Sequence, residues 1–113
     1  MTPQKFVDGV LKSVIRENLK LYRGIFADPG EVTDEYWMRA LDLFRSLSRA
    51  HQKTLLDIMK QVEVDTVSNL FGILDGSSQI SGKLEDFDLI HKGSGVRLNG
   101  ELQDLLLEKT ESE

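Results

Sequence analysis

With 113 residues, of which 40% are hydrophobic and 29% charged, the chain can form one hydrophobic core and is not globally disordered. It contains no cysteine, which excludes disulfides, thiolate nucleophiles and cysteine zinc sites, and its net charge of -5 disfavours nucleic-acid binding. No apolar run approaches the ~18 residues of a membrane span and no signal sequence opens the chain, so we expect a cytoplasmic protein without membrane association, cofactor or metal.

The first predicted helix begins after Thr2, whose side chain can cap it, with Pro3 in the first turn, where a missing N–H costs nothing. It should end before Pro29, because proline disfavours the helical conformation in the preceding residue. One helix face carries the expected buried stripe of Val7, Leu11, Val14, Ile15, Leu19 and Tyr22. A basic ridge follows another side at Lys12, Arg16, Lys20 and Arg23.

Two further helices follow. The second is predicted to begin at Thr33 as its N-cap and the third at Ser48. The third should run from about Arg49 to Leu74 and end at Gly76, which suits the left-handed position after a helix. The predicted buried face of the second helix consists of Trp37, Ala40, Leu41, Phe44 and Leu47.

Beyond Gly82 the apolar period changes towards that of short strands. Residues 84–91 and 96–98 are predicted to form a hairpin around a glycine-rich loop. A two-stranded hairpin is unstable alone, so we expect it to pack on the helices through Phe87, Leu89 and Leu98. Asn99 can cap a last helix over residues 100–108, which would turn Leu102, Leu105 and Leu106 inward.

These elements predict a mainly α fold with a minor β component. Its core is a three-helix arrangement with a long central third helix, to which a small β-hairpin and a short C-terminal helix are added. We expect one helical domain over residues 1–108, hairpin included, and a frayed polar tail over residues 109–113.

Two polar residues interrupt the third helix. At 100° per residue, Asp65 and Asn69 fall on or beside the apolar stripe formed by Leu55, Ile58, Met59, Val62, Thr66 and Ile73. A buried carboxylate requires partners. One interpretation places Asp65 and Asn69 in a small-ligand pocket with Asn18 and either Tyr22 or Trp37. The other, which we prefer, makes them an interhelical hydrogen-bond pair that fixes packing.

No catalytic set is evident. His51 lies in the first turn of the third helix, and His91 precedes the glycine-rich loop. A catalytic His91 would need a nucleophile or bound water, which the spacing does not identify. The Gly93–Gly95 segment lacks the lysine and further glycine of a phosphate-binding loop. An enzyme is therefore the third-ranked functional class.

Charge is unevenly distributed. Residues 1–60 hold ten Lys and Arg against eight Asp and Glu, whereas residues 61–113 hold four against eleven. Our leading hypothesis is a non-catalytic protein-binding module, of regulatory or immunity-type inhibitor kind, whose acidic face meets a basic partner. That face would consist of Glu85, Asp86, Asp88, Glu101 and Asp104.

Two alternatives stay open. The chain can be a small-ligand or effector-binding protein that uses a pocket near Asp65 and Asn69. It can also form a homodimer, because the apolar hairpin face or the Leu105–Leu107 run could serve as a seam between copies.

Overall fold

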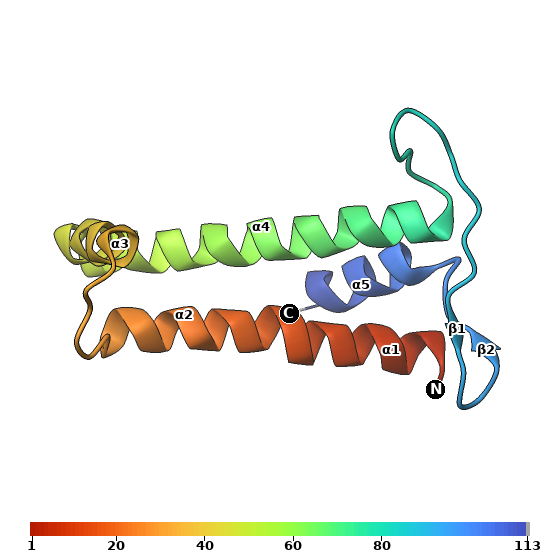
Figure 1. The fold of residues 1–113 in the computed structure, drawn as a ribbon, viewed down its shortest axis with the longest axis horizontal. Helices are drawn as coiled ribbons and strands as arrows, with labels where there is room; N and C mark the ends of the chain where they lie inside the picture. The colour runs from red at the N-terminus through yellow and green to blue at the C-terminus, as the bar shows by residue number, and fades with distance from the viewer. Residues whose placement is uncertain (113) are drawn as a thin grey trace.

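The computed structural model describes residues 1–112, and these residues form two long antiparallel helical rods with smaller elements between and beside them (Figure 1). α3 lies at one end of the molecule, beside the start of α4, and α5 lies between the rods towards the other end. This mainly helical arrangement with a small hairpin confirms the predicted fold class. In chain order the elements are α1 (Pro3–Val10), the π-helical segment η1 (Leu11–Arg16), α2 (Glu17–Ala27), α3 (Glu35–Ser46), α4 (Arg49–Asp75), β1 (Ile90–His91), β2 (Val96–Arg97) and α5 (Leu102–Glu111).

Short polar side chains cap the starts of three helices. The side chain of Thr2 accepts a hydrogen bond from the backbone N–H of Lys5, and that of Ser48 accepts one from His51, as predicted. α3 begins one residue later than expected, because Asp34 rather than Thr33 is its N-cap. Gly76 ends α4 in the left-handed conformation, with φ of +80°.

The first rod buries a residue every fourth position. Val7, Leu11, Ile15 and Leu19 are each at most 4% exposed. A strict four-residue repeat drifts around an α-helix of 3.6 residues per turn, and the wider π-turns of η1 keep these side chains aligned. Val14, predicted to belong to this stripe, is 43% exposed, so that prediction is wrong.

α5 completes the core. It lies between α1 and the C-terminal half of α4 (Figure 1), and its Leu102 and Leu106 are fully buried. The Leu105–Leu107 run, considered as a seam between copies, therefore contributes to the core through Leu106. α5 continues to Glu111, so residues 109–111 of the expected tail are helical. The buried core cluster consists of Val7, Leu11, Ile15, Leu19, Val64, Phe71, Leu102 and Leu106.

An extended segment joins α4 to the short hairpin, in which Ile90 pairs with Arg97 and His91 with Val96. Leu98 is buried as predicted, whereas Phe87 is 38% exposed. Asn99 was expected to cap the last helix, and this prediction is wrong. The buried Asn99 amide accepts a hydrogen bond from the Leu89 N–H and donates to two backbone carbonyls, those of Leu74 and Phe87.

Asp75, at the end of α4, caps α5 instead of Asn99. Its carboxylate accepts hydrogen bonds from the backbone N–H groups of Gly100, Leu102 and Gln103 at 2.7, 3.1 and 2.9 Å. A negative charge at the start of a helix also favours the helix dipole. Asp75 therefore holds the N-terminus of α5 against the C-terminus of α4.

Candidate binding surfaces

Only part of the predicted stripe of α4 faces the core. Ile58 and Val62 are 54% and 58% exposed, and the buried positions of the helix are instead Val64, Ser68, Phe71 and Gly72. Val64, Val67 and Phe71 form a second apolar arc of the helix, which packs against α5 and the first rod. The expectation that Ile58 and Val62 line the interior is therefore wrong, whereas Leu55 is half-buried and Met59 packs partly against the core.

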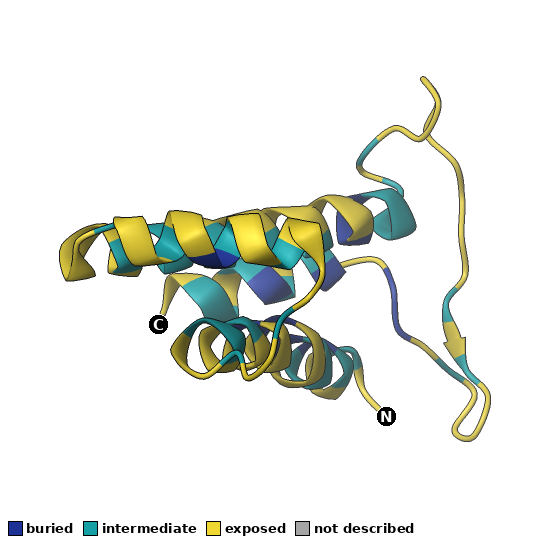
Figure 2. Cartoon of the chain, turned by 60° about the vertical axis from the view of Figure 1, so that its left-hand side comes forward, coloured by how far each residue is buried: buried dark blue, intermediate teal, exposed yellow. Residues whose placement is uncertain are grey.

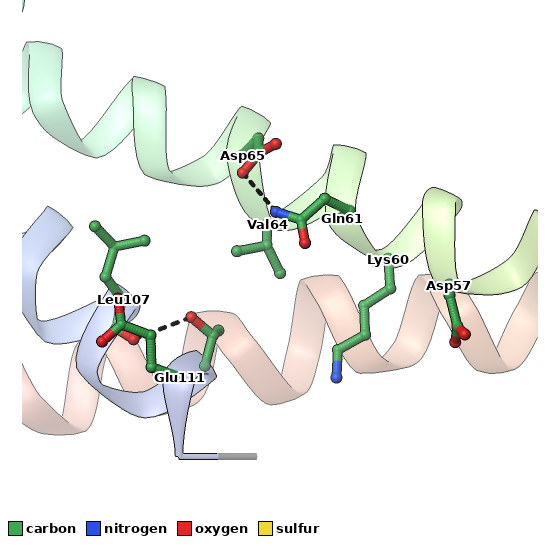
Figure 3. Close-up of a pocket in the computed structure, with 8 residues that line it drawn as sticks. Asp57, Lys60, Gln61, Val64, Asp65, Leu107 and Glu111 are labelled. Atoms are coloured by element: carbon green, nitrogen blue, oxygen red, sulfur yellow. Dashed lines mark hydrogen bonds between the residues drawn. The ribbon is translucent and has the colours of Figure 1, made fainter. Parts of the chain in front are cut away.

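Asp65 and Asn69 consequently lie on the outside of α4. Asp65 accepts a hydrogen bond from the side-chain amide of Gln61, one turn earlier in the same helix, at 2.9 Å. It borders a depression of about 480 Å³ beside the end of α5, together with Asp57 and Lys60 (Figure 3). The interhelical pair that we preferred does not form, because Asp65 bonds within its own helix.

Asn18, Tyr22 and Trp37 do come together, but around a different site. They line a groove of about 480 Å³ between α2, α3 and the N-terminal half of α4, away from Asp65 and Asn69. The structure thus divides the predicted ligand-binding set into two places. The groove lining consists of Asn18, Tyr22, Phe26, Tyr36, Trp37, Ala40, Leu43, Leu55, Ile58, Met59, Val62 and Glu63.

Aromatic side chains of α2 and α3 pack together at this groove. Tyr22 and Trp37 have ring centroids 5.7 Å apart, and Tyr36 meets Trp37 edge-on at 5.4 Å. Phe26 and Phe44 stack in parallel at 4.3 Å. Such contacts join α3 to α2, because Tyr22 and Phe26 share one face of α2 by their four-residue spacing.

Large apolar side chains surround the groove on the surface. We call this surface the apolar face. Its members, all in the groove lining, and their exposed fractions are Tyr36 (60%), Leu43 (56%), Ile58 (54%) and Val62 (58%).

The five predicted acidic residues are all exposed. An added Cβ at Gly76, the C-cap of α4, would lie 4.0 Å from the carboxylate of Asp86, and Glu101 follows the glycine that donates to Asp75. Asp88 pairs with Arg97 at 2.8 Å. The junction of α4 and α5 therefore gathers Asp86 and Glu101, while Asp88 is partly neutralised on the hairpin.

His91 serves the local turn. Its Nδ1 lies 2.7 Å from the hydroxyl of Ser94 and also accepts the backbone N–H of Ser94 at 3.1 Å. A general base needs that lone pair for the hydroxyl proton, and here the backbone amide occupies it. His51 is exposed in the first turn of α4. The geometry of neither histidine supports a catalytic role.

Asp8 links α1 to α5. Its carboxylate lies 3.0 Å from the ammonium of Lys12 and 3.7 Å from that of Lys109 in α5. The hydrogen bond from Lys12, assisted by the charges of both lysines, holds the pKa of Asp8 below its usual range.

Residues 1–112 contain neither a candidate metal site nor a candidate membrane-spanning helix. Among residues 1–112, no three His, Asp or Glu side chains gather closely enough to hold a metal ion. Over the same part of the chain, no helix combines the length and apolar content needed to cross a membrane. Comparisons with protein-family models, with curated proteins and with solved structures find no match.

Proposed function

We propose that this chain is a non-catalytic protein-binding module whose partner covers the apolar face. The observation that carries the proposal is the group of four large apolar side chains, each 54–60% exposed, that line one groove. Folded monomers rarely expose large contiguous apolar patches, and those that occur commonly mark interaction sites. Among the described residues that line the groove, Glu63 alone is charged.

The composition of the groove favours a protein partner. Tyrosine and tryptophan are the residues most enriched at binding hot spots, and Tyr22, Tyr36 and Trp37 meet here. A groove between helices accepts the apolar side of a further helix, whose side chains at three- and four-residue spacing enter it. The apolar face therefore suits a helical protein surface.

The exposed acidic residues form a second candidate surface, towards a basic partner of the regulatory or inhibitor type. Their full exposure and the gathering of Asp86 and Glu101 at the α4–α5 junction support this role. Such a complex depends on charge, so its association should slow steeply as salt is added. A complex made through the apolar face should respond little to salt.

A small ligand is the alternative occupant of the groove. Its volume of about 480 Å³ falls within the range of known ligand pockets, and Asn18 offers one polar anchor. Trp37 is the only tryptophan of the chain, so its fluorescence should change when a ligand enters. In cytoplasmic extract, such a ligand would be found in a small-molecule fraction rather than among proteins.

Affinity capture with three forms of the tagged chain tests the proposal: wild type, Val62→Glu and Leu84→Glu. Val62 is 58% exposed on the apolar face, and Leu84 is 60% exposed on the extended segment outside the groove, so the two variants make the same chemical change in similar exposure. Each form is incubated with lysate of the source organism at low and at high salt, and bound proteins are identified by mass spectrometry.

We expect a stoichiometric protein, with an untagged copy of this chain counted as one, that wild type and Leu84→Glu retain and Val62→Glu loses at both salt concentrations. Equal capture by all three forms would overturn the role of the apolar face. If capture is equal and disappears at high salt, the acidic surface is the binding site. Capture of no protein, copies of this chain included, would overturn the proposed function.

A further inference from the structure

Burial is uneven along the molecule. In the fully described helices α2 and α3, the only buried residues are Leu19 and Leu41. The structure describes residues 49–63, the first half of α4, in full, and none of these residues is buried. Figure 2 shows the contrast, since the buried stretches concentrate where α5 meets the rods. Helices gain most of their stability by packing an apolar face, so this part of the chain lacks cover.

The total surface supports the same conclusion. The accessible area is 7920 Å² for a mass of 12.8 kDa. A compact folded monomer of that mass is expected to expose about 6,300 Å², so the excess is about 1,600 Å². The extended segment before the hairpin accounts for part of it. If two chains each covered such an excess, they would bury about 3,200 Å² in total, an area typical of obligate homodimers.

We propose that the partner on the apolar face is a second copy of this chain, an inference that rests on the proposed function. The face carries both halves of a self-complementary contact. α2, α3 and α4 form the groove, and its α4 side presents the exposed Ile58 and Val62, which are spaced by four residues and can pack against the same groove of another copy. In a two-fold dimer the α4 helix of each copy can lie along the groove of the other.

The need for permanent cover also favours a second copy. The groove leaves Tyr22 and Trp37 partly exposed beside a half of α4 that has no fully buried side chain, which is costly for a chain without a partner. A second copy is present wherever the chain is made, and at equal concentration. Asn18 and Glu63 are polar residues within the seam, and polar residues in an apolar seam favour one register over others.

The molar mass of the purified full chain in solution tests this inference. Sedimentation or light scattering over a wide range of concentration should give twice 12.8 kDa for wild type and for Leu84→Glu. Val62→Glu and Leu43→Glu, which place charges on the α4 side and the α3 side of the groove, should halve the mass. Both residues are more than half exposed in the single chain, so circular dichroism should show that the variants stay helical.

Each result decides the question. A wild-type chain that is monomeric at all concentrations overturns the inference. Dimeric Val62→Glu and Leu43→Glu variants overturn it as well, because the copies then associate elsewhere. If wild type is monomeric but lysate capture finds a different protein through the apolar face, this inference fails and the proposed function stands. If the chain is monomeric and captures nothing, both fail.

Discussion

The two ends of the molecule are built from the same kind of amphipathic helix but differ in how completely the helices are covered. At the α5 end, three helices share a core, and Val7, Leu102 and Leu106 are fully buried. At the α3 end, aromatic rings join the helices, yet Tyr36, Leu43 and Ile58 remain more than half exposed. The comparison teaches that one end is stabilised within the chain, whereas the other keeps the exposed apolar surface to which we assign the proposed partner.

Truncation of a core leucine should produce the largest contrast between the ends. Leu106→Ala removes a fully buried side chain from the α5 end, and we expect it to lower the free energy of unfolding by about 2–5 kcal/mol. Leu43→Ala, at the α3 end, should have an effect that depends on chain concentration, because in the proposed dimer the Leu43 side chain contacts the second copy. Denaturant unfolding at two concentrations measures both. A concentration-independent loss of similar size in Leu43→Ala would contradict the comparison.

Removal of the cap of α5 should have the next largest effect. Asp75→Ala leaves the N–H groups of Gly100, Leu102 and Gln103 without their acceptor, and we expect a loss of about 1–3 kcal/mol. Asp104→Ala is the matched control, since it also removes a carboxylate near the start of α5 but an exposed one. Equal thermal unfolding of the two variants would show that Asp75 does not hold the α5 end together.

A methyl group at Gly72 tests how tightly that end is packed. An added Cβ would lie 2.5 Å from the hydroxyl of Ser78 and 3.1 Å from the amide of Gln103, which itself donates to Ser68. We expect Gly72→Ala to cost about 1–2 kcal/mol and Ser78→Ala to restore much of the loss in the double variant. Gly24→Ala, whose Cβ would meet nothing within 4 Å, is the control at the other end of the molecule. A neutral Gly72→Ala would mean that the α5 end is looser than described.

The smallest expected effect concerns Asp8 and pH. The folded pKa of this carboxyl is lowered, so its contribution to stability is present above the unfolded pKa and is lost as the pH falls through the folded value. Asp8→Asn should therefore unfold at a slightly lower temperature than wild type near neutral pH, and the difference should vanish in acid. Lys5→Gln, which removes an exposed charge from the same helix, is the control. A difference that persists in acid would exclude the ion pair as its cause.

Much of the fold could be predicted because its signals are local. The capping residues Thr2 and Ser48, the left-handed Gly76 and the four-residue repeat of the first rod each act within one or two turns of the chain. The face of α4 could not be predicted, because the helix carries two apolar arcs and periodicity does not say which one the rest of the chain covers. Ile58 and Val62 look like core residues in the sequence because they are apolar and share one face of the helix. The same property suits them to contact a partner.

The binding surfaces were predictable only in part, for a similar reason. Tyr22 and Trp37 were proposed for one pocket and do meet, whereas Asp65 turns to Gln61 in its own helix. The role of Asp75 was missed because the backbone N–H groups that donate to it lie 25–28 residues away in the chain. Only tertiary structure brings such partners together, although an aspartate next to the glycine that ends a helix was the available signal.

The position of α5 has a consequence for how the protein is made. Leu102 and Leu106 are translated after every other element, yet they occupy the space between α1 and α4. A nascent chain therefore carries two long amphipathic helices whose facing sides cannot be closed until these last leucines are synthesised. Copies that stop before residue 102 would keep Val7, Leu11 and Phe71 open to solvent, which is the type of surface that chaperones and proteases recognise.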